Sequence, residues 1–168
     1  MHTIQPENFY PWQKRLLDMV RQPPHWTDRR IIWIWNPQGN SGKSAFTKYL
    51  LVHLPGTVVV SGKATDIAHG IATYHEEKAG TDTPYPALVV VDSPRVAEGH
   101  VSVAGIEGVK NGVVVSNKYE GARLLFNAPH VIVFANCEPD YDQLSLDRWF
   151  VRRIDNTTKD FINGAEMD

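Results

Sequence analysis

The sequence predicts an α/β protein with a central, mostly parallel β-sheet flanked by helices. The main observation is a set of four apolar, largely β-branched runs of strand length, at residues 31–35, 57–60, 87–91 and 130–135. Such continuous runs are typical of strands buried on both faces, and the segments between several of them have helical character. A glycine-rich turn between the first run and a helix supports the same class. A chain of 168 residues fits one domain.

The first expected element is a helix over residues 9–21. Its apolar side chains recur at helical spacing, and Pro11 is acceptable in a first turn. These side chains are Phe9, Trp12, Leu16, Leu17 and Val20. Pro23 and Pro24 end the helix, and residues 25–30 form a polar link to the first strand.

The remaining elements follow in order along the chain. Residues 46–51 belong to a helix that ends at Pro55-Gly56, residues 64–78 form another helix, and residues 80–86 form a loop. Residues 155–168 are polar and are expected to fray.

Composition narrows the functional class. The formal net charge is −2, so any contact with nucleic acid has to be local or shared among subunits. A single cysteine, Cys137, excludes a disulfide framework and fits a reducing compartment. The longest apolar runs are far shorter than the roughly 20 residues of a membrane helix, and no signal-peptide pattern opens the chain. We therefore expect a soluble intracellular protein that does not bind membranes.

The most informative segment joins the first strand to the next helix. It predicts a phosphate-binding loop, because backbone N–H groups and the helix N-terminus would converge on one concavity. Its candidate ligands are Gly39, Asn40, Ser41, Gly42, Lys43, Ser44 and Ala45. Lys43 would reach the β- and γ-phosphates of a nucleotide, and Ser44 would ligate Mg²⁺. Pro37 replaces the usual first glycine, and the alternative is a glycine-rich turn that happens to carry a lysine.

Two polar residues follow other predicted strands. Asp92 follows the run 87–91, where sheets of this kind place the acid that organises Mg²⁺. The position of a second carboxylate is taken by Ser93, so Asp92, Glu98 or a polar neighbour would have to activate the attacking water. Asn136 follows the run 130–135 and could present its amide to the γ-phosphate and the water. Alternatively, each residue only begins a turn.

Cations occur in two further places. Arg148, Arg152 and Arg153 could stabilise charge on the γ-phosphate, also from a neighbouring subunit, although surface salt bridges are the simpler explanation for any one of them. Residues 109–121 suggest a hairpin or protruding loop that displays Lys110, Lys118 and Tyr119. A cation beside an aromatic side chain suits single-stranded nucleic acid, but an ordinary solvated hairpin is equally compatible with the pattern.

Together these motifs resemble the helicase domain of replication-initiator (Rep) proteins of circular single-stranded DNA viruses, in particular the nanovirus- and alphasatellite-like lineages. The resemblance covers roughly residues 9–154. The matching motifs, in chain order, are Pro11-Trp12-Gln13, Gly39 to Ser44, Gly62 to Ile67, Asp92 to Arg95, Lys110 to Gly112 with Lys118 to Glu120, Asn136, and Asp147-Arg148-Trp149.

The resemblance implies a superfamily 3 helicase, an ATPase of the AAA+ type that uses ATP and Mg²⁺ and forms a ring, expected to be a hexamer, around single-stranded DNA. It implies Walker-motif roles for Lys43, Ser44 and Asp92, a sensor role for Asn136 and an arginine-finger role for Arg148. It also implies that Lys118, with Lys110, binds DNA. The implied domains are an oligomerisation segment (1–28), the ATPase domain (29–154) and a polar tail (155–168), in the host nucleus.

Full-length Rep proteins of this type begin with a nicking domain that carries a metal-binding histidine motif and a tyrosine nucleophile. The seven histidines are scattered here, so we expect a helicase domain that does not itself nick or join DNA. Two other functions stay open: a small-molecule or nucleotide kinase, and a nucleotide-binding assembly module with little hydrolysis, which Ser93 makes conceivable. A kinase would need an arginine-rich lid and an acceptor site, and neither is evident between Asp92 and Asn136.

Overall fold

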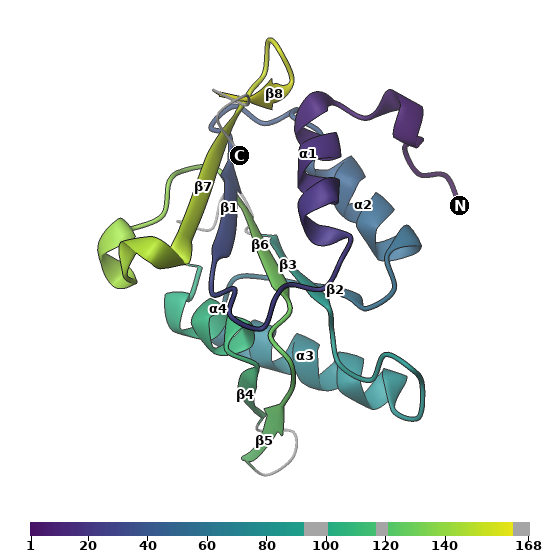
Figure 1. Cartoon of the computed structure of the whole chain (residues 1–168), viewed down its shortest axis with the longest axis vertical. Coiled ribbons are helices and arrows are strands. Elements are labelled where there is room, and N and C mark those ends of the chain that lie inside the picture. Colours follow the sequence, from purple (N-terminus) through teal and green to yellow (C-terminus); the bar gives the residue numbers. More distant parts are fainter. Residues whose placement is uncertain (93–100, 117–120, 163–168) are drawn as a thin grey trace.

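The fold is built around one six-stranded sheet (Figure 1). The computed structural model describes residues 1–92, 101–116 and 121–162. The sheet has the order β2-β3-β6-β1-β7-β8, in which every pair is parallel except β7 with β8. Its strands are β1 (Ile31–Trp35), β2 (Thr57–Val60), β3 (Leu88–Asp92), β6 (His130–Ala135), β7 (Trp149–Asp155) and β8 (Asp160–Phe161).

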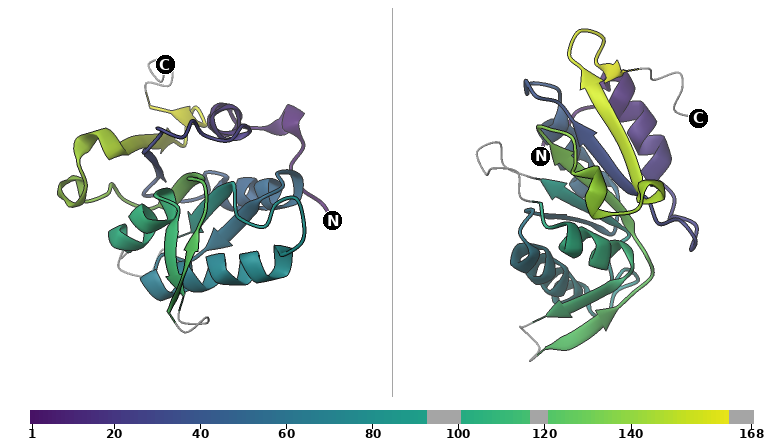
Figure 2. Two further views of the ribbon diagram at one scale, coloured as in Figure 1. Left: turned by 60° about the horizontal axis from the view of Figure 1, so that its bottom comes forward. Right: turned by 90° about the vertical axis from the view of Figure 1, so that its left-hand side faces the viewer.

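Helices cover both faces of this sheet, so the fold is a three-layer α/β/α arrangement (Figures 1 and 2). One face packs against α1 (Pro11–Val20) and α2 (Lys43–His53), and the other packs against α3 (Ala64–Lys78) and α4 (Val103–Lys110). The 3₁₀ helices of the described residues, η1 (Pro6–Asn8), η3 (Tyr141–Gln143) and η4 (Leu146–Arg148), lie outside the sheet in the connecting segments.

Alternate residues of the buried strands point to opposite faces and so build two cores. In β1, Ile31 and Trp33 join the cluster under α3 and α4, whereas Ile32 and Ile34 join the cluster under α1 and α2. The continuous apolar runs of the sequence therefore reflect two buried faces rather than one.

The predicted class, α/β with a mostly parallel sheet between helices, is confirmed. The strands at 31–35, 57–60 and 130–135 and the helix at 64–78 have the predicted bounds. The sequence did not reveal α4, β5, β7 or β8 as elements.

The expectation of a frayed tail from residue 155 is wrong for its first part. Asp155 ends β7, and β8 pairs with β7 through Ile154 opposite Phe161. Phe161 is 3% exposed because it packs against Trp12 of α1, and this contact ties the segment to the core.

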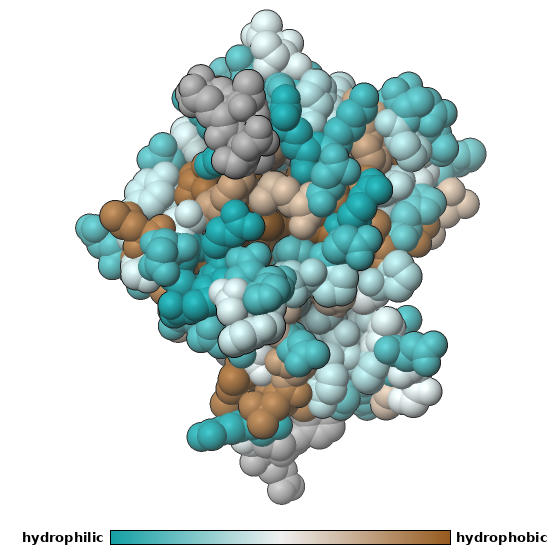
Figure 3. All heavy atoms as spheres, in the orientation of Figure 1, coloured by the Kyte–Doolittle hydropathy of each residue, from teal (hydrophilic) through white to brown (hydrophobic). Residues whose placement is uncertain are grey.

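A second, two-stranded sheet lies at the lower end of Figure 1. It pairs β4 (Val113–Ser116) with β5 (Ala122–Leu125) in antiparallel register. The sequence suggested a hairpin or protruding loop over residues 109–121, whereas the paired strands extend to Leu125 and residues 109–110 end α4. Val114 and Leu124 pack into the core, whereas Val113, Val115 and Leu125 are exposed and form an apolar patch (Figure 3). Among the described helices, none has the length and apolarity needed to span a bilayer.

Candidate functional site

The candidate site lies at the carboxyl edge of the parallel strands. The chain leaves β1 through the glycine-rich loop (residues 36–42) and enters α2 on one face of the sheet. From the neighbouring strand β6 it continues toward the opposite face, where Leu144 and Trp149 pack. Adjacent strands whose connections diverge in this way leave a crevice at their carboxyl ends, which is where ligands bind in open α/β sheets.

The glycine-rich loop has an unusual backbone conformation. Gly39, Asn40 and Gly42 all have positive φ, at 75°, 53° and 93°. Asn36, which is fully buried, stabilises the first turn because its Oδ1 accepts hydrogen bonds from the N–H groups of Gln38 (2.9 Å) and Gly39 (2.8 Å). Successive left-handed and right-handed residues turn backbone N–H groups toward one side, and such a concavity suits an anion.

The start of α2 supplies the other expected phosphate ligands. Lys43 is its first residue and half-buried, and its Nζ donates a hydrogen bond to the carbonyl oxygen of Ala135 at 3.1 Å. Ser44 is exposed and Ala45 is half-buried, both in the first turn. The N–H groups of this turn and the helix dipole favour negative charge at this end of the helix.

The structure brings Asp92 and Asn136 to the same edge as Lys43. Asp92 is the exposed last residue of β3 and lies in register with Phe134 of β6, while Ala135 lies opposite Trp35 of β1. Asn136 directly follows β6, beside the carbonyl that Lys43 contacts. The carboxylate of Asp92, the amide of Asn136 and the ammonium of Lys43 thus come from the segments at or just after the ends of three adjacent strands, β3, β6 and β1. Ser93 and Glu98 lie outside the described residues.

Arg148 does not lie at this edge, and the arginine-finger role that the family resemblance implies for it stays a prediction. It is 2% exposed, and its guanidinium donates to the carbonyl of Arg29 (2.7 Å), the carboxylate of Glu107 (3.3 Å) and Oδ1 of Asn111 (3.4 Å). Burial lowers its pKa below the usual value, with Arg29 adding to the effect. All three of these hydrogen bonds hold the Arg148 guanidinium within its own subunit.

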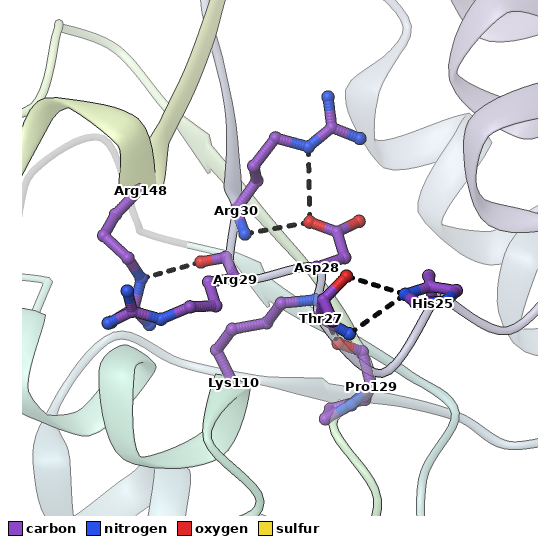
Figure 4. A network of polar contacts seen from close by, with 8 residues as sticks. All are labelled: His25, Thr27, Asp28, Arg29, Arg30, Lys110, Pro129 and Arg148. Atoms are coloured by element: carbon purple, nitrogen blue, oxygen red, sulfur yellow. Dashed lines mark hydrogen bonds and ion pairs between the residues drawn. The ribbon is translucent and has the colours of Figure 1, made fainter.

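Lys110 is also buried, so the prediction that a hairpin displays it is wrong, while its role in DNA binding stays a prediction. It ends α4, is 2% exposed, and its Nζ donates to the carbonyl of Pro129 at 2.9 Å (Figure 4). Burial lowers its pKa, against the opposing attraction of Asp28.

The hairpin itself offers a different cation. Lys118 and Tyr119 lie outside the described residues, but Arg123 of β5 is exposed opposite Val115. Sequence reasoning passed over Arg123 because no alternating pattern marked residues 122–125 as a strand.

Two further arginines do lie near the carboxyl edge. Arg153 pairs with Trp35 in the β1–β7 register, is exposed, and holds its guanidinium 4.9 Å from the Trp35 ring centre. Arg152 lies over Phe150 at 4.1 Å, and burial lowers its pKa. Both line an open cavity of about 450 Å³ with Glu138 and Tyr141.

No dedicated metal cage is found, because among the described residues no group of three or more His, Cys, Asp or Glu side chains gathers. Magnesium commonly binds through one or two protein oxygens together with substrate phosphates and waters. Ser44 and Asp92 fit that type of site, so the donor set is compatible with Mg²⁺ bound to a nucleotide.

The fold and site thus define an α/β protein with a glycine-rich loop at a topological switch point, and comparison with known proteins shows viral proteins that are similar to it. The chain is 38% identical over 140 residues to the Para-Rep C3 protein of the Milk vetch dwarf C3 alphasatellite, which covers 82% of the chain and 45% of that relative. It is 39% identical over 120 residues to the master replication protein of Subterranean clover stunt virus (strain F), which covers 71% of the chain and 38% of the relative.

A third relative, the master replication protein of Milk vetch dwarf virus (isolate N), is 34% identical over 138 residues, 82% of the chain and 43% of the relative. No protein-family model matches the chain. The chain spans less than half the length of these curated relatives. Its homologues are therefore viral replication-initiator proteins, and this supports the predicted resemblance at the level of a Rep-like protein.

Proposed function

We propose that this chain is the ATP-hydrolysing helicase domain, of superfamily 3 and the AAA+ type, of a viral replication initiator. The observation that carries the proposal is the meeting of three strand ends at one edge, where Lys43 bonds the end of β6 next to Asn136 and Asp92 ends β3. The glycine-rich loop adds three positive-φ residues, a backbone conformation that suits the binding of an anion.

In this proposal each residue has a separate role. The N–H groups of the loop residues, Gly39 to Ala45, hold the phosphates, and Lys43 exchanges the Ala135 carbonyl for the β- and γ-phosphate oxygens. Bound Mg²⁺ would neutralise phosphate charge and would be held by Ser44 and Asp92. Asn136 orients the attacking water with its amide. Activation of that water falls to Asp92, the exposed carboxylate that ends β3.

The proposal extends to a ring of subunits around single-stranded DNA, expected to be hexameric. A helicase would supply the strand separation that DNA replication needs, and the names of the relatives, Para-Rep C3 and master replication protein, support a role in replication. With Arg148 buried, Arg153 and then Arg152 become the arginines that would complete a neighbour's site. Arg123 is the described cation of the hairpin that would face DNA, with Lys118 and Tyr119 beside it in sequence. The expected setting is the host nucleus, with a nicking domain in the same full-length protein.

DNA-stimulated ATP turnover tests this function against the alternatives. We expect phosphate release from ATP that requires Mg²⁺ and rises several-fold when single-stranded DNA is added. A nucleotide kinase would instead be stimulated by nucleoside acceptors, and an assembly module would bind ATP without turnover.

Asp92→Asn and Glu138→Gln form a matched pair for that assay. Both replace an exposed carboxylate by its amide at the same end of the fold, but only Asp92 has a proposed role in holding Mg²⁺. Loss of turnover in Asp92→Asn alone supports the site. Equal turnover in both variants and the parent would refute it.

A further inference from the structure

The carbonyl oxygens of the glycine-rich loop show a regular pattern that the sequence did not suggest. Four successive carbonyls, those of residues 39–42, each accept a hydrogen bond from a side chain outside the loop. The donors are Asn156 Nδ2 to Gly39 (3.0 Å), Lys159 Nζ to Asn40 (2.8 Å), Trp12 Nε1 to Ser41 (2.9 Å) and Gln13 Nε2 to Gly42 (3.1 Å). Two donors come from α1 and two from the turn between β7 and β8.

The two donors from α1 are themselves held firmly. Trp12 is fully buried between the rings of Phe46, Phe134 and Phe161. Gln13 is 2% exposed, and its Oε1 accepts the N–H of Tyr10 at 2.9 Å, so only its amide nitrogen is directed at the loop.

The two donors from the β7–β8 turn are linked to the same scaffold. Asn156 accepts a hydrogen bond from Asn36 Nδ2 at 3.3 Å, and Asn36 also donates to the carbonyl of Ile154 at 2.8 Å. The carbonyl of Lys159 accepts the N–H of Trp12 at 3.2 Å, which joins the turn to the start of α1.

This pattern fixes the direction of the loop's N–H groups. In a planar trans peptide, the carbonyl of one residue and the N–H of the next point in opposite directions. When the carbonyls of residues 39–42 are drawn toward α1 and the β7–β8 turn, the N–H groups of residues 40–43 must point away from both elements. Those N–H groups are the ones proposed to hold the phosphates, and donors fixed in advance bind an anion without a cost of reorganisation.

We infer that Trp12, Gln13, Asn156 and Lys159 are positioning residues of the phosphate site, so that α1 and the β7–β8 turn form part of the nucleotide-binding machinery. The inference rests on the proposed function. It gives the segment 1–28 a role within its own subunit, in addition to the oligomerisation that the family resemblance implies. It also explains why residues 155–161 fold back onto α1.

Substitutions that remove one donor and keep the shape test the inference. Gln13→Glu keeps the oxygen that accepts the Tyr10 N–H and replaces the donating amide by a carboxylate oxygen facing the Gly42 carbonyl. Asn156→Asp does the same at Gly39. Lys159→Met removes the ammonium group and nearly keeps the length of the side chain. Lys14→Met is the matched control, because Lys14 is an exposed lysine of α1 beside Gln13 and the change in charge is identical.

The readout is the steady-state kinetics of ATP hydrolysis together with the thermal midpoint. Phosphate contacts of the loop bind substrate and transition state alike, so their loss should raise KM and leave kcat nearly unchanged. We expect KM for ATP to rise about three- to tenfold for each of the three donor variants, with kcat within about twofold, and both values unchanged in Lys14→Met.

A purely structural role would lower the thermal midpoint without moving KM, and that result in Gln13→Glu and Asn156→Asp would overturn the inference. Trp12→Phe is a further variant, but because Trp12 is fully buried its folding must be checked first. ATP binding and hydrolysis by the unsubstituted protein, the parent, test the proposed function separately. If the parent neither binds nor hydrolyses ATP, the function fails, whereas an active parent with KM-neutral variants refutes only the positioning role.

Discussion

The two ends of the parallel sheet use the same residue types in opposite ways. At the carboxyl edge, Lys43 and Arg153 are at least partly exposed around backbone N–H groups. At the amino edge, Lys110 and Arg148 are almost completely buried. Both edges collect positive charge, but among the described residues it is the cations of the carboxyl edge that are at least partly exposed, and Arg153 lines an open cavity there.

At the amino edge, side chains hold the segment that precedes β1 by hydrogen bonds to its backbone (Figure 4). The carbonyl of Arg29 binds Arg148 just before β7, and the carbonyl of Gln22 binds His130 at the start of β6. Burial by itself would raise the pKa of Asp28, but hydrogen bonds from Arg30 and the charge of Lys110 lower it on balance. Burial and existing hydrogen-bond partners therefore decide whether a cation of this fold can act on a ligand.

The largest expected effect concerns Lys43. Lys43→Ala should reduce kcat for ATP by about 100- to 1000-fold, because it removes one fixed positive charge from the transferring phosphate. The side chain is half-buried and bonds one carbonyl, so the thermal midpoint should move by only a few degrees. Phosphate release and circular dichroism check both. Near-normal turnover in a folded variant would contradict the proposed role of Lys43 at the phosphates.

The next effect belongs to the amino edge. Arg148→Met should lower the free energy of unfolding by about 2–3 kcal/mol, because it leaves the Arg29 carbonyl and Glu107 without their charged donor. Urea denaturation measures this loss, and ATP affinity under native conditions should stay near the parent value.

Arg29→Met is the control for Arg148→Met. Its side chain makes an exposed 3.9 Å ion pair with Asp147, worth about 0–1 kcal/mol, while its backbone carbonyl remains. If Arg148→Met were stable but unable to hydrolyse ATP in a ring, the arginine would act at the nucleotide after all.

A pH effect should come from His130, also at the amino edge. Burial lowers its pKa, a shift that the Gln22 carbonyl and Asp28 oppose and that Lys110 and Arg30 support. The folded state therefore keeps the imidazole neutral, whereas the unfolded chain takes up a proton near pH 6.5. The contribution of His130 to the free energy of unfolding is therefore fully present above about pH 6.5, and it is lost as the pH falls below that value.

Denaturation of the parent and of His130→Gln at pH 7.5 and pH 5.5 tests this sign. We expect the parent to lose more stability between the two values than the variant does. A parent that becomes more stable at pH 5.5 relative to His130→Gln would contradict the assignment.

The smallest effect concerns DNA. Arg123→Met should weaken binding of single-stranded DNA about two- to threefold and reduce its salt dependence, since one phosphate contact per subunit is lost. Lys110→Met removes the same charge at a buried position and should leave DNA affinity unchanged under conditions where the fold is intact. Filter binding at two salt concentrations separates the two variants, and a larger effect from Lys110→Met would reverse the assignment.

Uninterrupted runs of apolar residues made much of the fold predictable from the sequence. Strands buried on both faces, such as β1 and β6, stand out in the sequence, and their ends place Lys43, Asp92 and Asn136 together. β7 was missed because Arg152 and Arg153 interrupt its apolar residues and β8 covers it only at one end. The short helix α4 was missed because two glycines lie within its eight residues.

The roles of individual cations could not be predicted from the sequence. Whether Lys110 and Arg148 face solvent depends on contacts with Pro129 and Arg29, which are distant in the chain. The same is true of Asn156 and Lys159, whose bonds to the glycine-rich loop span more than a hundred residues. Local spacing carries no signal for such contacts.

Hydrogen–deuterium exchange with and without Mg²⁺ and a non-hydrolysable ATP analogue tests whether the glycine-rich loop binds a triphosphate. The analogue should slow exchange of the N–H groups in residues 39–45 and leave exchange in residues 22–30 and 107–112 unchanged. That result would show a triphosphate bound by backbone donors at the carboxyl edge. Unchanged exchange in residues 39–45 at a saturating concentration, or protection confined to the amino edge, would contradict it.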